Sequence, residues 1–83
     1  MEITRKIGFL QAVAKHPGGS VSRIRDISGF NWDDMKNIIG DLVDAGLIVL
    51  ERKSRVNARY PRLTSKGRKV LGDWDRIMEE LSE

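Results

Sequence analysis

Apolar side chains recur at helical spacing in the first part of the chain. Residues 3–15 repeat them every three or four positions, and Pro17 with the two following glycines ends the repeat. This spacing with this stop predicts a helix over residues 3–15. Residues 20–22 are expected as a short extended stretch, with Ser22 as the N-cap of a brief helix over 23–28.

A further helix is predicted over residues 32–45, after a tight turn at 28–31. Asn31 is a suitable N-cap, and Gly46 follows the last turn as a helix-ending glycine. One stripe of this helix is apolar and is expected to be buried: Met35, Ile38, Ile39, Leu42 and Val43.

A short apolar run then replaces the helical repeat. Residues 47–50 are apolar and rich in β-branched side chains, which predicts a strand. A second strand is predicted over residues 58–63, which contain Tyr60 and Leu63, and a polar tip at 53–57 joins the two into a β-hairpin. Pro61 restricts the second strand to a sheet edge or a bulge. The apolar spacing returns after the hairpin and predicts a last helix that reaches about residue 82, capped by Thr64 or Ser65.

Three short segments resemble a known protein family more specifically than the order of the helices and strands does. They are VSRIRDISG at 21–29, LVDAGLI at 42–48 and YPRLTSKG at 60–67. Together they resemble the winged helix-turn-helix DNA-binding family, in particular MarR-, ArsR- and PadR-like transcriptional regulators. The resemblance implies an α+β, mostly helical fold with an added C-terminal helix. It implies one domain over 1–83, with the core and wing in 1–63 and a dimerisation helix in 64–83.

Charge is distributed unevenly along the 83 residues, although the net charge is only +3. Residues 48–72 carry eight basic side chains against the single acid Glu51, whereas residues 73–83 are acidic. A basic block in the middle of the chain indicates contact with a polyanion.

The hairpin concentrates the basic side chains and is the first candidate for DNA contact. Its candidate residues are Arg52, Lys53, Arg55, Asn57, Arg59 and Arg62. Arginine forks suit phosphates and narrow minor grooves. The alternative is a solvated turn whose charges deter strand-to-strand aggregation. Weaker candidates flank the hairpin: Arg5, Lys6, Arg23, Arg25, Lys66, Arg68 and Lys69.

The helix over 32–45 is the expected DNA-reading helix, yet its exposed face is acidic. Asp33 and Asp34 have a local explanation, because anions are favoured in the first turn of a helix. A second interpretation is base recognition, with Asn37 pairing with adenine and Asp33 accepting a hydrogen bond from cytosine. A third is that this face binds a protein. The candidate DNA contacts here are Trp32, Asp33, Lys36 and Asn37.

The last helix has the spacing of a coiled-coil seam. Its apolar side chains are Val70, Leu71, Trp74, Ile77, Met78 and Leu81. They predict either packing on the first helix of the same chain or a homodimer in which Ile3 and Ile7 also take part. Dimer formation is a natural way for so small a chain to gain stability.

Other chemistry finds little support in the sequence. There is no cysteine and His16 is the only histidine, so we expect no catalytic residue, no metal site and no cofactor. No apolar run is long enough to span a membrane and no signal peptide is evident, so we expect a cytoplasmic or nucleoid-associated location. The sequence thus predicts a small duplex DNA-binding regulator with an unidentified effector or protein partner. A protein-docking module and a sequence-neutral DNA-coating protein are the alternatives.

Overall fold

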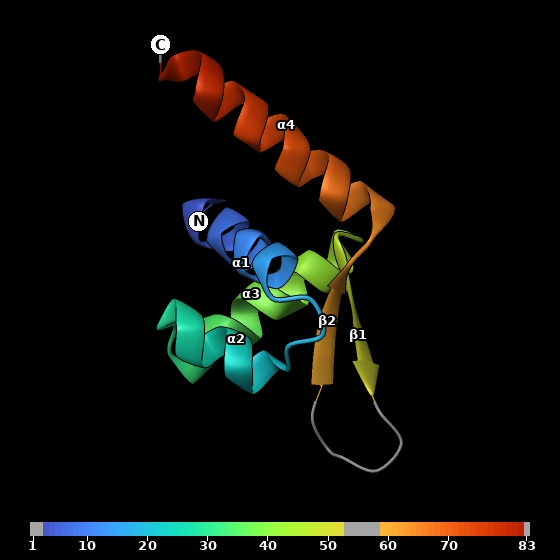
Figure 1. Cartoon of the computed structure of the whole chain (residues 1–83). Coiled ribbons are helices and arrows are strands. Elements are labelled where there is room, and N and C mark those ends of the chain that lie inside the picture. The colour runs from blue at the N-terminus through green and yellow to red at the C-terminus, as the bar shows by residue number, and fades with distance from the viewer. Residues whose placement is uncertain (1–2, 53–58, 83) are drawn as a thin grey trace.

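The computed structural model describes residues 3–52 and 59–82. Its elements follow the order α1 (Ile3–Lys15), α2 (Val21–Ser28), α3 (Trp32–Asp44), β1 (Ile48–Arg52), β2 (Arg59–Leu63) and α4 (Ser65–Leu81). In Figure 1 the three N-terminal helices form one body with the hairpin beside them, and α4 rises away from it. This is the mostly helical winged helix that the sequence predicts, with the added C-terminal helix.

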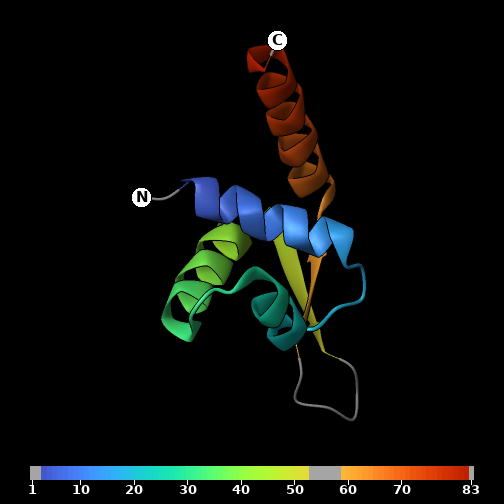
Figure 2. The same ribbon diagram turned by 60° about the vertical axis from the view of Figure 1, so that its left-hand side comes forward.

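One hydrophobic core joins α1, α2, α3 and the base of the hairpin. In Figure 2, α1 lies across α2 and α3. The largest fully buried side chains come from all four elements: Phe9, Leu10, Ile24, Met35 and Ile48. Since each helix has an apolar stripe, packing them around these residues removes the stripes from water.

Three of the helices begin at a side-chain cap. Asn31 Oδ1 accepts a hydrogen bond from the Asp34 amide at 2.8 Å, and Thr64 Oγ1 accepts one from the Gly67 amide at 3.0 Å. Both caps confirm the sequence prediction. For α2 the prediction is wrong, because Ser20 rather than Ser22 is the N-cap and residues 21–22 are helical rather than extended. Ser20 Oγ accepts a hydrogen bond from the Arg23 amide, so the helix begins two residues earlier than predicted.

The hairpin is antiparallel, with Ile48 opposite Leu63 and Arg52 opposite Arg59. Strand β1 extends to Arg52, two residues beyond the predicted run. Pro61 lies within β2, opposite Leu50, and in the described residues the sheet has two strands, so both are edges that tolerate proline.

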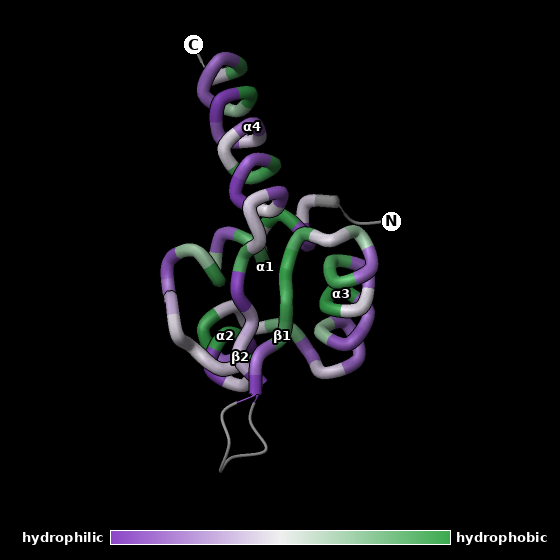
Figure 3. The backbone as a smooth tube through the Cα atoms, turned by 90° about the vertical axis from the view of Figure 1, so that its right-hand side faces the viewer, coloured by the Kyte–Doolittle hydropathy of each residue, from purple (hydrophilic) through white to green (hydrophobic). Residues whose placement is uncertain are grey.

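The first turn of α4 is fastened to the junction between α3 and β1. Thr64 Oγ1 donates to the Gly46 carbonyl at 2.6 Å, and Lys66 Nζ donates to the Ala45 carbonyl at 2.8 Å. Gly67 is buried so close to the Leu47 carbonyl that a Cβ atom would overlap with it. Beyond this anchored turn α4 projects from the body, as Figure 3 shows, and the molecule is 47 Å long against 25 and 22 Å across.

The predicted buried stripe of α3 is only partly correct. Met35, Ile38 and Leu42 are buried, but Ile39 is half-buried and Val43 is 40% exposed. The two exceptions are rotated from the core toward the hairpin, where they line a surface groove.

Candidate nucleic-acid interface

The described end of the hairpin presents exposed arginines. Arg52 and Arg59 are cross-strand partners at the point where the described strands end. Arg62 is also exposed, and its Nε lies 2.8 Å from Glu51 Oε1, so part of its charge is neutralised within the hairpin. Lys53, Arg55 and Asn57 lie outside the described residues.

The outer face of α3 carries the other candidate DNA contacts. Trp32, Asp33, Lys36 and Asn37 are all exposed and lie in the first two turns of the helix. Trp32 and Lys36 are one turn apart, as are Asp33 and Asn37, so these four side chains form one continuous patch. The structure thus brings together all the candidates of this helix.

Two of the four acids of α3 are engaged by the first helix of the same chain. Arg5 Nη1 lies 2.9 Å from Asp34 Oδ2, and Lys6 Nζ lies 2.9 Å from Asp41 Oδ2. These pairs leave Asp33 and Asp44 as the acids on the outer face. Arg5 and Lys6, two of the weaker candidates for DNA contact, therefore pair with α3 in this structure, and Lys66 donates to the Ala45 carbonyl at the C-terminal end of that helix.

Arg25 is a further cation that the structure places beside α3. Its guanidinium carbon lies 4.9 Å from the centroid of the Trp32 ring, which is a cation–π distance. Arg25 Nη1 is 3.5 Å from Asp26, and the buried Nε has no partner among the described residues. From the sequence, Arg25 was only a weak candidate for phosphate contact, because seven positions and a turn separate it from Trp32 along the chain.

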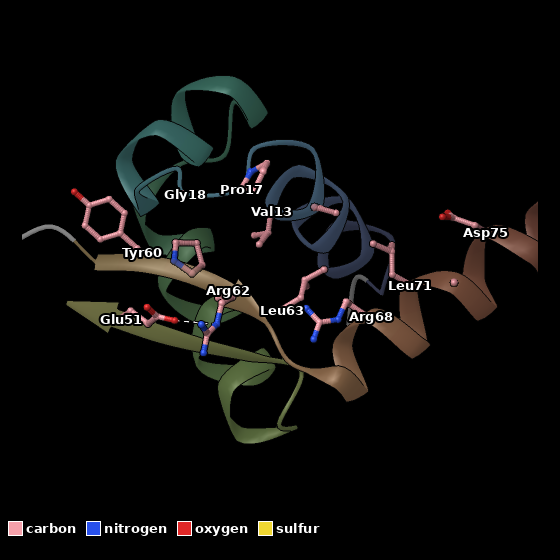
Figure 4. Close-up of a pocket in the computed structure, with 13 residues that line it drawn as sticks. Val13, Pro17, Gly18, Glu51, Tyr60, Arg62, Leu63, Arg68, Leu71 and Asp75 are labelled. Atoms are coloured by element: carbon pink, nitrogen blue, oxygen red, sulfur yellow. Dashed lines mark ion pairs between the residues drawn. The ribbon is translucent and has the colours of Figure 1, made fainter. Parts of the chain in front are cut away.

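Two grooves flank this interface. One, of about 430 Å³, runs between α3 and the hairpin and has Trp32, Ile39, Val43 and Leu50 in its walls. The other, of about 550 Å³, lies between the end of α1, strand β2 and α4. Figure 4 shows the residues around the second groove, where apolar side chains such as Leu63 and Leu71 lie near Arg62 and Arg68.

The apolar residues predicted to form a dimer separate into two groups. Ile7 and Leu71 are buried in the core of their own chain, and Val70 and Trp74 are half-buried against it. Ile77 and Met78 are 46% and 44% exposed, and Leu81 is 75% exposed. Ile3 is the first residue of α1, and its side chain lies outside the described part.

Within the described residues, no group of His, Asp or Glu side chains is arranged to hold a metal ion. Over the same residues, no helix has the length and apolar character needed to span a membrane.

The sequence matches no protein-family model and no curated protein. Solved structures do match it. MepR of Staphylococcus aureus in complex with DNA superposes with a TM-score of 0.84 at 17% identity, over 95% of this chain and 59% of that chain. The PcaV transcriptional regulator of Streptomyces coelicolor with its natural ligand superposes with a TM-score of 0.79 at 21% identity, over 93% of this chain and 57% of that chain. The transcriptional regulator BldR of Sulfolobus solfataricus superposes with a TM-score of 0.80 at 20% identity, over 93% of this chain and 55% of that chain.

These similarities confirm the fold that the sequence motifs implied. The chain has the MarR-like winged helix-turn-helix fold, in which α2 and α3 are the helix-turn-helix and β1 with β2 forms the wing. The chain spans about 55–59% of the length of the solved chains that it matches.

Proposed function

We propose that this chain binds double-stranded DNA as a transcriptional regulator, with the hairpin on the backbone or minor groove and α3 at the major groove. The observation that carries the proposal is the superposition of 95% of the chain on MepR bound to DNA. The exposed Arg52 and Arg59 at the described end of the hairpin support it, because exposed arginines on a wing can reach phosphates.

In this proposal the hairpin supplies affinity and α3 supplies selectivity. Lys36 is the only cation on the outer face of α3, so that face adds little general attraction for phosphates. Asn37 and Asp33 are the side chains that suit adenine and cytosine, and each good pairing is worth about 1–3 kcal/mol of discrimination. Arg23, exposed in the first turn of α2, is a further phosphate contact in this arrangement.

We also propose that two copies pair through the projecting part of α4. Ile77, Met78 and Leu81 lie on one side of this helix and have too little of their own chain to pack against. A second α4 would cover them. Two linked DNA-binding faces bind one duplex more tightly than either face alone, because the second contact becomes intramolecular.

The binding of duplex DNA across a range of salt concentrations tests the main proposal. A pool of random duplexes of about 20 base pairs, two helical turns, serves as the probe in fluorescence anisotropy. The wild type should bind at low salt, and its affinity should fall with a log–log slope of about 0.9 per phosphate contact. Enrichment of particular sequences from the pool is expected if α3 reads bases.

The matched variants are Arg52→Ala with Arg59→Ala, and Lys15→Ala with Arg76→Ala as the control. Both remove two exposed cations, but the control removes them from α1 and α4. Only the hairpin variant should lose affinity and lower the salt slope, by about 0.9 for each lost phosphate contact. Equal losses in both variants would contradict a special role for the hairpin.

A protein-docking module is the second candidate function, favoured by Asp33 and Asp44 on the outer face of α3. It predicts that no duplex binds even at the lowest salt concentration. A DNA-coating protein predicts binding without enrichment of any sequence.

We further propose that the groove between α1, β2 and α4 accepts a small organic acid as effector. Its apolar lining suits a hydrophobic body, and Arg68 suits a carboxylate, whereas Arg62 in the same groove is already paired with Glu51. PcaV, which has the same fold, was solved with its natural ligand. Benzoate is a simple probe, and Arg68→Gln should remove any rise in melting temperature that benzoate causes. A rise of equal size in the variant would rule this groove out.

A further inference from the structure

The groove between α3 and the hairpin is apolar, although it separates the two elements that we assign to DNA. Its α3 wall is formed by Trp32, Ile39 and Val43, and Leu50 of β1 faces them. Trp32 and Val43 remain 46% and 40% exposed, so the groove is open to solvent. Exposed apolar walls in this position are not explained by attraction for phosphates alone.

Charged side chains of opposite walls border the groove. Lys36 stands on the α3 side and Arg59 on the β2 side, while Asp44 lies at the C-terminal end of α3. The groove therefore offers one cation on each side of an apolar surface, and its acid is confined to one end. A cation on either side of an apolar surface suits a sugar with a phosphate on each side of it.

The indole of Trp32 has a cation against its ring and lies at the start of a capped helix. The Arg25 guanidinium stacks at 4.9 Å from the ring centroid, and Asn31 caps the helix in which Trp32 is the first residue. A fixed aromatic side chain loses little conformational entropy when it contacts a ligand.

We propose that this groove takes the backbone of one DNA strand, with deoxyribose carbons against Trp32, Ile39 and Val43 and the neighbouring phosphates on Lys36 and Arg59. The inference rests on the proposed function, since a helix in the major groove and a wing in the minor groove have one strand between them. Beyond the proposed function, the protein would then recognise the deoxyribose of that strand. A ribose 2′-hydroxyl seated against Trp32, Ile39 and Val43 would lose water and meet side chains that offer it no hydrogen bond, so deoxyribose is preferred there.

Ribonucleotide scanning measures the preference for deoxyribose. Single ribonucleotides are placed in turn along one strand of a DNA duplex that the wild-type protein has enriched from the random pool. A single substitution keeps the duplex close to its DNA form, so the effect reports the local contact. We expect one or two adjacent positions to weaken binding about tenfold, the cost of one unpaired buried hydroxyl.

Trp32→Ser and Ile27→Ser are the matched protein variants. Ile27, on α2, is 47% exposed against 46% for Trp32 and does not line the groove. Trp32→Ser should weaken binding to the DNA duplex about tenfold without changing the salt slope, because the lost contact is apolar. It should also remove the penalty at the sensitive ribonucleotide positions. Ile27→Ser should keep both the affinity and the penalty.

The outcomes separate this inference from the proposed function. If the wild type binds no duplex, the proposed function fails and the inference with it. If the wild type binds, but no ribonucleotide position is sensitive or the penalty is unchanged in Trp32→Ser, only the groove assignment is overturned. Thermal unfolding of each variant keeps loss of fold apart from loss of contact, and Trp32→Phe, which retains an aromatic face, should recover most of the binding.

Discussion

The two halves of α4 have the same amphipathic pattern but different surroundings. The first half, residues 65–71, is fastened to the body by Thr64, Lys66 and the close approach of Gly67 to Leu47, and it buries Leu71 in the core. The second half, residues 72–81, projects and leaves Ile77, Met78 and Leu81 exposed, and only Trp74 among its apolar side chains is half-buried against the core. Periodic apolar residues thus show which face of a helix needs a partner, but they do not show whether that partner is the same chain.

The largest effect is expected from Gly67→Ala, which tests the anchored half. The added Cβ would overlap with the backbone carbonyl of Leu47, and the backbone cannot turn aside as a flexible side chain does. We expect the free energy of unfolding to fall by about 3 kcal/mol. Urea denaturation monitored by circular dichroism measures it. A loss below about 0.5 kcal/mol, the usual range of surface substitutions, would show that α4 is not anchored here.

Replacement of Ile77 and Leu81 by serine tests the projecting half. Each apolar side chain buried by a partner contributes about 1.5–3 kcal/mol, so the double variant should raise the dimer dissociation constant at least 100-fold. Sedimentation equilibrium gives this constant directly. Asp75→Ser with Glu79→Ser, exposed residues of the same half, is the control and should leave the dimer intact. A wild type that stays monomeric at all concentrations would refute the pairing of α4.

Thr64→Ala is expected to have an intermediate effect on the anchored half. The Thr64 hydroxyl accepts from the Gly67 amide and donates to the Gly46 carbonyl, and alanine makes neither bond. Loss of an N-cap costs about 1 kcal/mol of stability, whereas Thr64→Ser keeps the hydroxyl and should retain most of it. Equal melting temperatures for the alanine and serine variants would show that the cap contributes nothing.

Gly72→Ala should have the smallest effect and the opposite sign. An added Cβ at Gly72 meets nothing within 4 Å, in contrast to Gly67. Alanine in a helix interior is favoured over glycine by about 0.5–1 kcal/mol, so the variant should be more stable in dilute solution, where chains are monomeric. A decrease in stability there would mean that the projecting half is held by its own chain after all.

The helix starts that depend only on neighbouring residues were predicted correctly from the sequence. Asn31 and Thr64 lie next to the helices that they cap, so local chemistry identified both starts. Ser20 and Ser22 both suit an N-cap, and the choice between them depends on how α2 packs, so the prediction chose wrongly. Val43 was expected in the core because it continues the apolar stripe, but the stripe is wider than the surface that α1 and the hairpin cover.

The candidate interface was predicted less completely, because its arrangement depends on contacts between distant residues. The patch from Trp32 to Asn37 follows from helical spacing. The pairing of Asp34 with Arg5, 29 positions away, does not follow from it, and this ion pair reduces the negative charge of the α3 surface. Nor did the sequence indicate the groove between α3 and the hairpin, which requires both elements to be placed in space.

Native mass spectrometry of the protein with an enriched duplex counts the chains bound to each DNA molecule. If the chain binds DNA as a dimer held by α4, the spectrum contains one duplex with two chains. Replacement of Ile77 and Leu81 by serine then shifts it to one chain that is bound more weakly. A spectrum that contains only free duplex at low salt, or one chain per duplex with unchanged affinity in the variant, would contradict this mode of binding.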